Sequence, residues 1–87
     1  MNNQLYQCVH LYGLDQEKYK DILAAYIYLL RIEEGKDGYL ATGNQRVYPI
    51  PRVDKVLSTP DDEEITVITN TVRFVFVKCR VKANEQV

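Results

Sequence analysis

The sequence predicts an α+β domain in which one long helix packs on a curved antiparallel sheet or half-open barrel of five to six strands. Two observations predict it. The segment 22–32, ILAAYIYLLRI, contains a single charged residue, and its apolar residues recur at helical spacing. From residue 39 onward the pattern becomes alternating, which is typical of strands. The expected order is therefore β-α-β-β-β-β-β, within one domain spanning 1–87 and with 83–87 as a frayed tail.

The first predicted elements are a strand and the long helix. Gln4 to Tyr12 alternates two mixed sets of side chains, which indicates a strand with both faces partly covered. Gly13 ends that strand, and Asp15 is suited to accept a hydrogen bond from the first helical turn. The helix is predicted from about Gln16 to Glu34, where the following glycine is a common left-handed stop.

One flank of this predicted helix is the candidate protein interface. Its apolar arc covers more than half of the cylinder, so one sheet cannot bury all of it. The part that a sheet can cover consists of Tyr19, Ile22, Leu23, Tyr26 and Leu30. Ala25, Tyr28 and Ile32 lie outside that part and would form an exposed apolar strip. We expect a protein partner to bind there, and pairing of two like strips predicts a homodimer.

Two further strands are predicted around Gly43 and Asn44. Tyr39 to Thr42 and Gln45 to Ile50 flank this pair, and a glycine in the first loop position suits a two-residue hairpin turn. Pro49, together with the proline two residues later, places the second strand at a sheet edge or ends it in a bend.

The segment 53–59 that follows fits either a strand or one helical turn, and the strand is the preferred interpretation. Thr59 to Glu63 is interpreted as a turn, since β-branched residues follow it at once.

The last two strands form the most strongly patterned part of the chain. Glu64 to Thr69 and Thr71 to Lys82 are predicted to pair across a turn at Asn70-Thr71. The resulting cross-strand partners are Val67 with Phe74, Ile65 with Phe76, Glu63 with Lys78 and Asp61 with Arg80. A register shifted by one residue through a bulged loop remains an alternative. Val72 to Val77 is apolar on both faces, which predicts an interior strand.

Cysteine and histidine are the residues to consider for metal binding or catalysis. Cys8 and His10 lie two positions apart on a predicted strand, and Cys79 could approach from another. A zinc site usually has paired ligands at short spacing and a fourth ligand, which this sequence lacks. A nucleophile and base pair would need an orienting acid and an oxyanion loop. We therefore predict structural cysteines, no catalytic residues, no metal and no cofactor.

Basic residues provide an alternative function. Arg46 and Arg52 in the middle of the chain, with Lys78, Arg80 and Lys82 on the last strand, are candidate nucleic-acid contacts. Against this, the formal net charge is −1 and the acidic run 61–64 lies close in the sequence. Phosphate contacts need positive charge that neighbouring acids do not cancel.

The composition favours a binding protein over an enzyme. Seven tyrosines without tryptophan suit a recognition surface, because tyrosine offers a large contact area and a hydrogen-bonding tip. We expect a small non-enzymatic protein-binding or regulatory module that acts through an apolar and tyrosine-bearing surface, such as an inhibitor or accessory protein of a mobile element. Nucleic-acid binding is the first alternative, and binding of a small ligand or metal is the second.

The expected location is the cytoplasm. No apolar run approaches membrane-spanning length, so no association with a membrane is predicted. The first fifteen residues lack the basic region and cleavage site of a signal peptide.

Overall fold

The computed structural model describes residues 4–79, which form a seven-stranded antiparallel sheet with the order β4-β3-β2-β1-β7-β6-β5. The strands are β1 (Leu5–Gly13), β2 (Tyr26–Arg31), β3 (Asp37–Thr42), β4 (Val47–Arg52), β5 (Lys55–Ser58), β6 (Glu64–Ile68) and β7 (Val72–Lys78). Two short 3₁₀ helices, η1 (Gln16–Ile22) and η2 (Pro60–Asp62), join β1 to β2 and β5 to β6.

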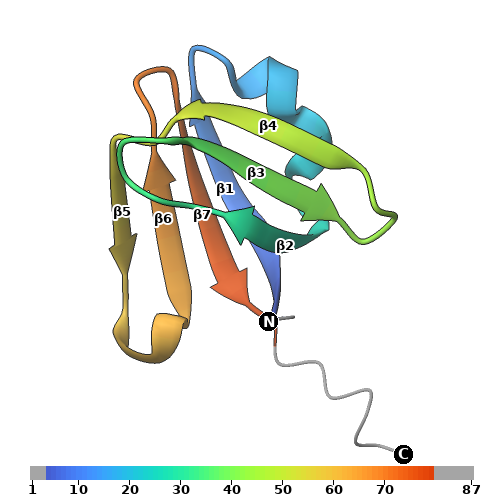
Figure 1. Ribbon diagram of the computed structural model, residues 1–87. Coiled ribbons are helices and arrows are strands. Elements are labelled where there is room, and N and C mark those ends of the chain that lie inside the picture. The colour runs from blue at the N-terminus through green and yellow to red at the C-terminus, as the bar shows by residue number, and fades with distance from the viewer. Residues whose placement is uncertain (1–3, 80–87) are drawn as a thin grey trace, which may run out of the picture.

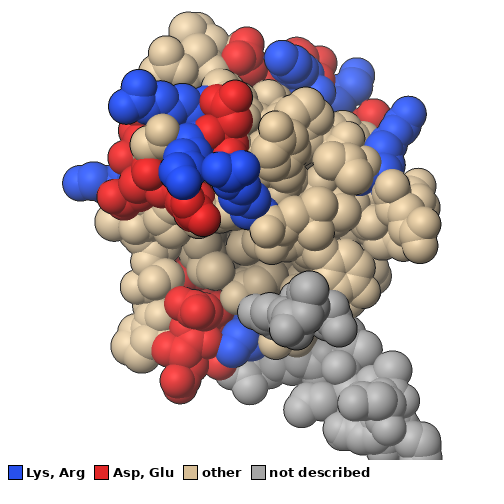
Figure 2. Space-filling model, viewed as in Figure 1, with Lys and Arg blue, Asp and Glu red and all other residues tan. Residues whose placement is uncertain are grey.

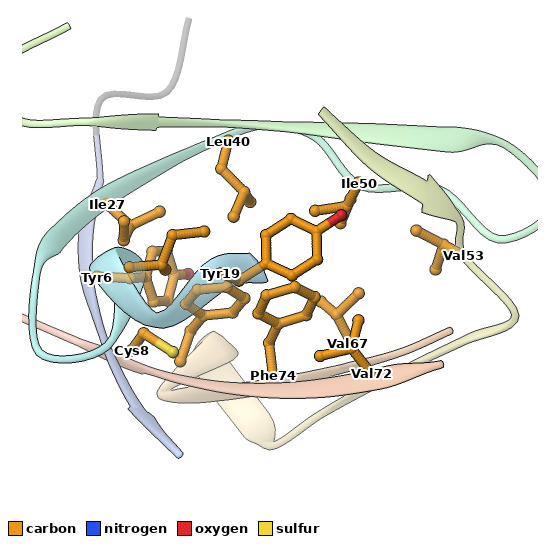
Figure 3. Packing of buried hydrophobic residues seen from close by; sticks show 12 residues of the cluster. Tyr6, Cys8, Tyr19, Ile27, Leu40, Ile50, Val53, Val67, Val72 and Phe74 are labelled. Carbon is orange, nitrogen blue, oxygen red and sulfur yellow. The ribbon is translucent and has the colours of Figure 1, made fainter. Parts of the chain in front are cut away.

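The sheet folds over on itself and encloses one core. In Figure 1, β2, β3 and β4 cross in front of β1, β7, β6 and β5, so that the sheet makes two layers. The core between them is built around Phe74, whose ring stacks on Phe76 and meets the edge of Tyr19 at a centroid distance of 5.3 Å (Figure 3). The other buried members of the cluster are Tyr6, Cys8, Ile22, Ile27, Leu40, Ile50, Val53, Val67 and Val72.

The prediction of one long helix is wrong, and so is the α+β class, because the structure is mostly an antiparallel sheet. Within the predicted span 16–34, only η1 is helical and it ends at Ile22, after which Ala24 adopts φ 68° and the chain continues as β2. In β2, Ile27 and Leu29 pack toward the core, while Tyr28 lies on the outer face. β2 pairs with β1 on one side and β3 on the other, so partners on both sides replace the hydrogen bonds that a helix would make.

Several strand predictions are confirmed. The N-terminal strand is present as β1, and 53–59 contains the strand β5 rather than a helical turn. In the β6–β7 hairpin, Val67 faces Phe74 and Ile65 faces Phe76. The backbone N–H of Lys78 donates to the Glu63 carbonyl at 2.8 Å, so that pair is confirmed as well. β7 lies between β1 and β6, as expected for an interior strand.

Two predictions fall on residues at the end of the chain. Arg80, the expected partner of Asp61, lies outside the described residues, as does the predicted frayed tail 83–87.

The turn between β3 and β4 differs from the predicted two-residue type. The N–H of Gln45 donates to the Thr42 carbonyl at 2.8 Å, and Gln45 has φ 69°. A type I turn followed by a left-handed residue is the usual three-residue hairpin loop. The left-handed position therefore falls on Gln45 and not on Gly43, and the loop has three residues, 43–45, instead of the predicted two.

Both edges of the sheet are obstructed. β4 contains Pro49 and Pro51, which have no N–H to donate to an added strand. At the opposite edge, the Glu34 carboxylate accepts a hydrogen bond from the N–H of Val56 in β5 at 2.8 Å. These features disfavour binding of a partner by strand addition.

Candidate protein-binding face

The outer side of β2, β3 and β4 carries a continuous apolar surface. The register places Leu5, Tyr28, Ala41 and Val47 side by side on four adjacent strands, in the order β1, β2, β3, β4. Other residues with the same outward position extend this row on both sides. We call the whole surface the tyrosine face, and it consists of Leu5, Tyr26, Tyr28, Leu30, Tyr39, Ala41, Val47 and Pro49.

Large side chains on this face are open to solvent. Leu30 is 56% exposed, Val47 54%, Tyr26 50% and Tyr39 38%. Figure 2 views this side of the molecule, and a broad area without charged side chains fills its centre and right, while charges gather toward the upper left and the rim. A contiguous apolar patch on a small domain is a common mark of an interaction site.

An irregularity in β2 enlarges the face. Leu29 pairs with Leu40 and Arg31 with Tyr39, so Leu30 is an extra residue in β2 at a bulge. Such an insertion bends a strand and changes the direction of the side chain it carries. It leaves Leu30 exposed and sets the Arg31 side chain beside Tyr39. Tyrosine and arginine are the residue types that most often dominate binding energy at protein interfaces.

The predicted interface residues do not lie together. Tyr28 is half-buried in the middle of the tyrosine face, between Leu5 and Ala41. Ala25 and Ile32 pack instead against the core cluster. The three residues were grouped as the flank of a helix. Strand alternation separates Ala25 from Tyr28, and the bulge at Leu30 places Ile32 on the inner side.

Sequence reasoning missed most of the face. Tyr39 and Val47 were assigned to strands but not to a surface, and Tyr26 and Leu30 were expected to be covered. The excess of tyrosine was the available signal, since three of the seven tyrosines lie here. The segment 26–31 was predicted as helix, and only its structure as the strand β2 brings these tyrosines onto one side.

Cys8 and His10 are separated by the structure. A bulge in β1 falls between them, and Cys8 is buried in the core while His10 is exposed. The Cys8 thiol donates to the backbone carbonyl of His10 at 3.4 Å, and burial raises the pKa of this thiol to about 11. A thiol that stays protonated at neutral pH is a poor nucleophile and a poor metal ligand. Within 4–79, no three histidine, cysteine or acidic side chains are arranged to hold a metal ion.

The basic residues of the alternative function also lie apart. Arg46 precedes β4 with its guanidinium 6.0 Å from the centre of the Tyr48 ring, and Arg52 ends the same strand opposite Asp37. Lys78 donates from Nζ to the Asp61 carbonyl at 2.7 Å, next to η2. Arg80 and Lys82 lie outside the described residues.

Comparison with known proteins gives no family: no family model, no curated protein and no solved structure matches this chain. Among the described residues, no helix has the length and apolar character needed to cross a bilayer.

Proposed function

We propose that this protein is a non-enzymatic protein-binding module that contacts its partner through the tyrosine face. The observation that carries the proposal is the row Leu5, Tyr28, Ala41 and Val47, which is flanked by exposed Tyr26, Leu30 and Tyr39. A partner that covers it removes apolar area from water, at about 25 cal/mol per Å².

The obstructed sheet edges support a face contact. Two prolines in β4 and the bond from Val56 to Glu34 at β5 leave few free N–H groups for a partner strand. The partner surface should therefore be apolar, and it should offer an acid to Arg31 and acceptors to the tyrosine hydroxyls. A second copy of the chain is the proposed partner, since two-fold pairing of like surfaces is the commonest arrangement of homo-oligomers. The proposed compartment is the cytoplasm, which suits two free thiols.

Sedimentation equilibrium on matched variants tests the proposal. Val47→Lys and Tyr39→Lys place charge on exposed positions of the face, so the fold should persist and the dimer should dissociate to monomers. Ser58→Lys is the control, because Ser58 is exposed at the end of β5, outside the tyrosine face.

If the wild-type chain is monomeric, co-purification from the native host decides between a different partner and none. A protein held by the wild type and by Ser58→Lys, and lost from Val47→Lys, supports the proposal with that partner. Identical capture by all three chains, or no capture by any, would rule out the tyrosine face as a binding surface.

A further inference from the structure

The outer side of the other layer has a different chemistry. The register places Tyr12 of β1, Arg73 of β7, Ile68 of β6 and Lys55 of β5 in one row across the four strands. The next row contains His10, Val75, Thr66 and Leu57 in the same strand order. We call these two rows the basic face. It lies on the opposite side of the molecule from the tyrosine face, because the two layers enclose the core between them (Figure 1).

Two aromatic rings lie at one end of this face. His10 and Tyr12 are exposed, their ring planes are parallel within 3°, and their centroids are 6.0 Å apart. They alternate along β1 with Leu11, which packs against the core. The Arg73 guanidinium lies 6.0 Å from the centre of the Tyr12 ring. An exposed ring beside a cation suits a flat π system that carries negative charge.

The charges on this face have one sign over most of its area. The two rows contain Arg73 and Lys55 and no acidic residue. Within the described part of these strands, Glu64 faces outward opposite Val77, one row beyond His10 and Val75. Arg73 and Lys55 are two strands apart, which corresponds to about 9.5 Å at the usual strand spacing. At the β5 edge, the Glu34 carboxylate on the Val56 N–H lies next to Lys55, so the positive charge that neighbouring acids do not cancel is centred on Arg73.

We propose that the basic face is a binding site for single-stranded nucleic acid. Bases stack on Tyr12 and His10, and phosphates contact Arg73 and Lys55. An acidic peptide would use the two cations but would have no need of exposed rings, so the combination favours nucleic acid. The site is independent of the tyrosine face, and the two together would let the protein bring a protein partner to a nucleic acid.

The site differs from the one that the sequence suggested. Of the basic residues predicted from the sequence, Lys78 donates a hydrogen bond to the Asp61 carbonyl near η2. Arg46 and Arg52 lie at the two ends of β4. The strand pairing instead selects Arg73 and Lys55, which are far apart in sequence and aligned across β7, β6 and β5.

Fluorescence anisotropy with a labelled oligothymidylate of twelve nucleotides tests the proposal. With two phosphate contacts, a tenfold rise in salt should weaken binding about 25-fold. Tyr12→Ala should weaken it about tenfold through lost stacking, while Tyr12→Phe should leave it nearly unchanged. Arg73→Ala and Lys55→Ala should each reduce the affinity and flatten the salt dependence.

Two controls test whether binding depends on the basic face and on its aromatic rings. Arg46→Ala and Lys78→Ala remove cations elsewhere on the molecule and should not change binding. A polyglutamate of equal charge should compete poorly. The proposal is overturned if no binding occurs at 20 mM salt, if the affinity depends on Lys78 rather than Arg73, or if polyglutamate binds as tightly and Tyr12→Ala has no effect.

Discussion

Glu34 and Val56 are joined by a hydrogen bond of 2.8 Å from the Val56 N–H to the Glu34 carboxylate, which ties the loop after β2 to the edge strand β5. In the same region, the Gly35 N–H donates to the Val53 carbonyl, and the Val53 N–H donates to the Lys36 carbonyl. Together these bonds connect the two layers of the sheet where its edges come together.

The first prediction concerns this connection. Glu34→Ala should lower the free energy of unfolding by about 1 kcal/mol, the usual net value of a hydrogen bond. Glu34→Gln should lose less, because its amide oxygen still accepts from Val56. Urea denaturation measures both. Glu33→Ala is the control, since the Glu33 side chain makes an exposed ion pair with Lys36 at 3.3 Å, and such pairs contribute little. Equal losses for Glu33→Ala and Glu34→Ala would contradict the assignment.

The second prediction concerns Gly13. Its φ is +129°, and an added Cβ would lie 2.3 Å from the Thr71 carbonyl oxygen. Gly13→Ala should therefore cost about 3 kcal/mol or more, from backbone strain and from displacement of the β6–β7 turn. Gly43→Ala is the matched control, because no atom lies within 4 Å of its added Cβ, and the change should stay within about 0.5 kcal/mol. Thermal unfolding of the two variants would refute the prediction if their midpoints agreed.

The third prediction is a pH dependence of stability that comes from Cys8. Burial raises the pKa of this thiol from 9.0 to about 11 in the folded protein. As the pH rises from about 9 to 11, the unfolded chain loses this proton while the folded chain keeps it. The free energy of unfolding should fall across that window and be unaffected by Cys8 below it. Denaturation at pH 8 and pH 10.5 should show a smaller fall in Cys8→Ala than in the wild type, and an identical fall would argue against a buried, protonated thiol.

The fourth prediction uses the confirmed pairing of Glu63 with Lys78. Glu63→Lys should destabilise modestly, and adding Lys78→Glu should recover part of the loss, with a coupling of about 0.2–1 kcal/mol. A double-mutant cycle by urea denaturation measures it. The Lys78 ammonium also donates to the Asp61 carbonyl, so the recovery should be incomplete. Strictly additive losses would show that the two side chains do not interact.

The sequence was most informative where one side of a strand is apolar and its partner has the same pattern. Val67 with Phe74 and Ile65 with Phe76 could be paired in advance, because the turn and the pattern agree on one register. The prediction for Tyr26 to Arg31 was wrong because this strand is apolar on both sides. Its inward residues, Ile27 and Leu29, alternate with large apolar residues of the tyrosine face, so no period of two was visible. An apolar run of this kind fits a buried helix as well as a strand.

The candidate site could be predicted in its chemistry but not in its location. A surplus of tyrosine indicated a recognition surface. Which tyrosines share that surface depends on pairings between residues distant in sequence, such as Tyr28 with Leu5 and with Ala41. The same holds for Arg73 and Lys55, which only the strand order brings into one row.

The pairing of β1 with β7 also determines when the protein can fold during its synthesis. Gly13 pairs with Val72 and Tyr6 with Lys78, so β1 cannot complete its pairing until β7 has been synthesised. Until β7 leaves the ribosome, β1 has only β2 beside it, and Cys8 remains without Phe76. Until β7 is available, the nascent chain exposes apolar strands, and we expect it to depend on a chaperone to avoid aggregation.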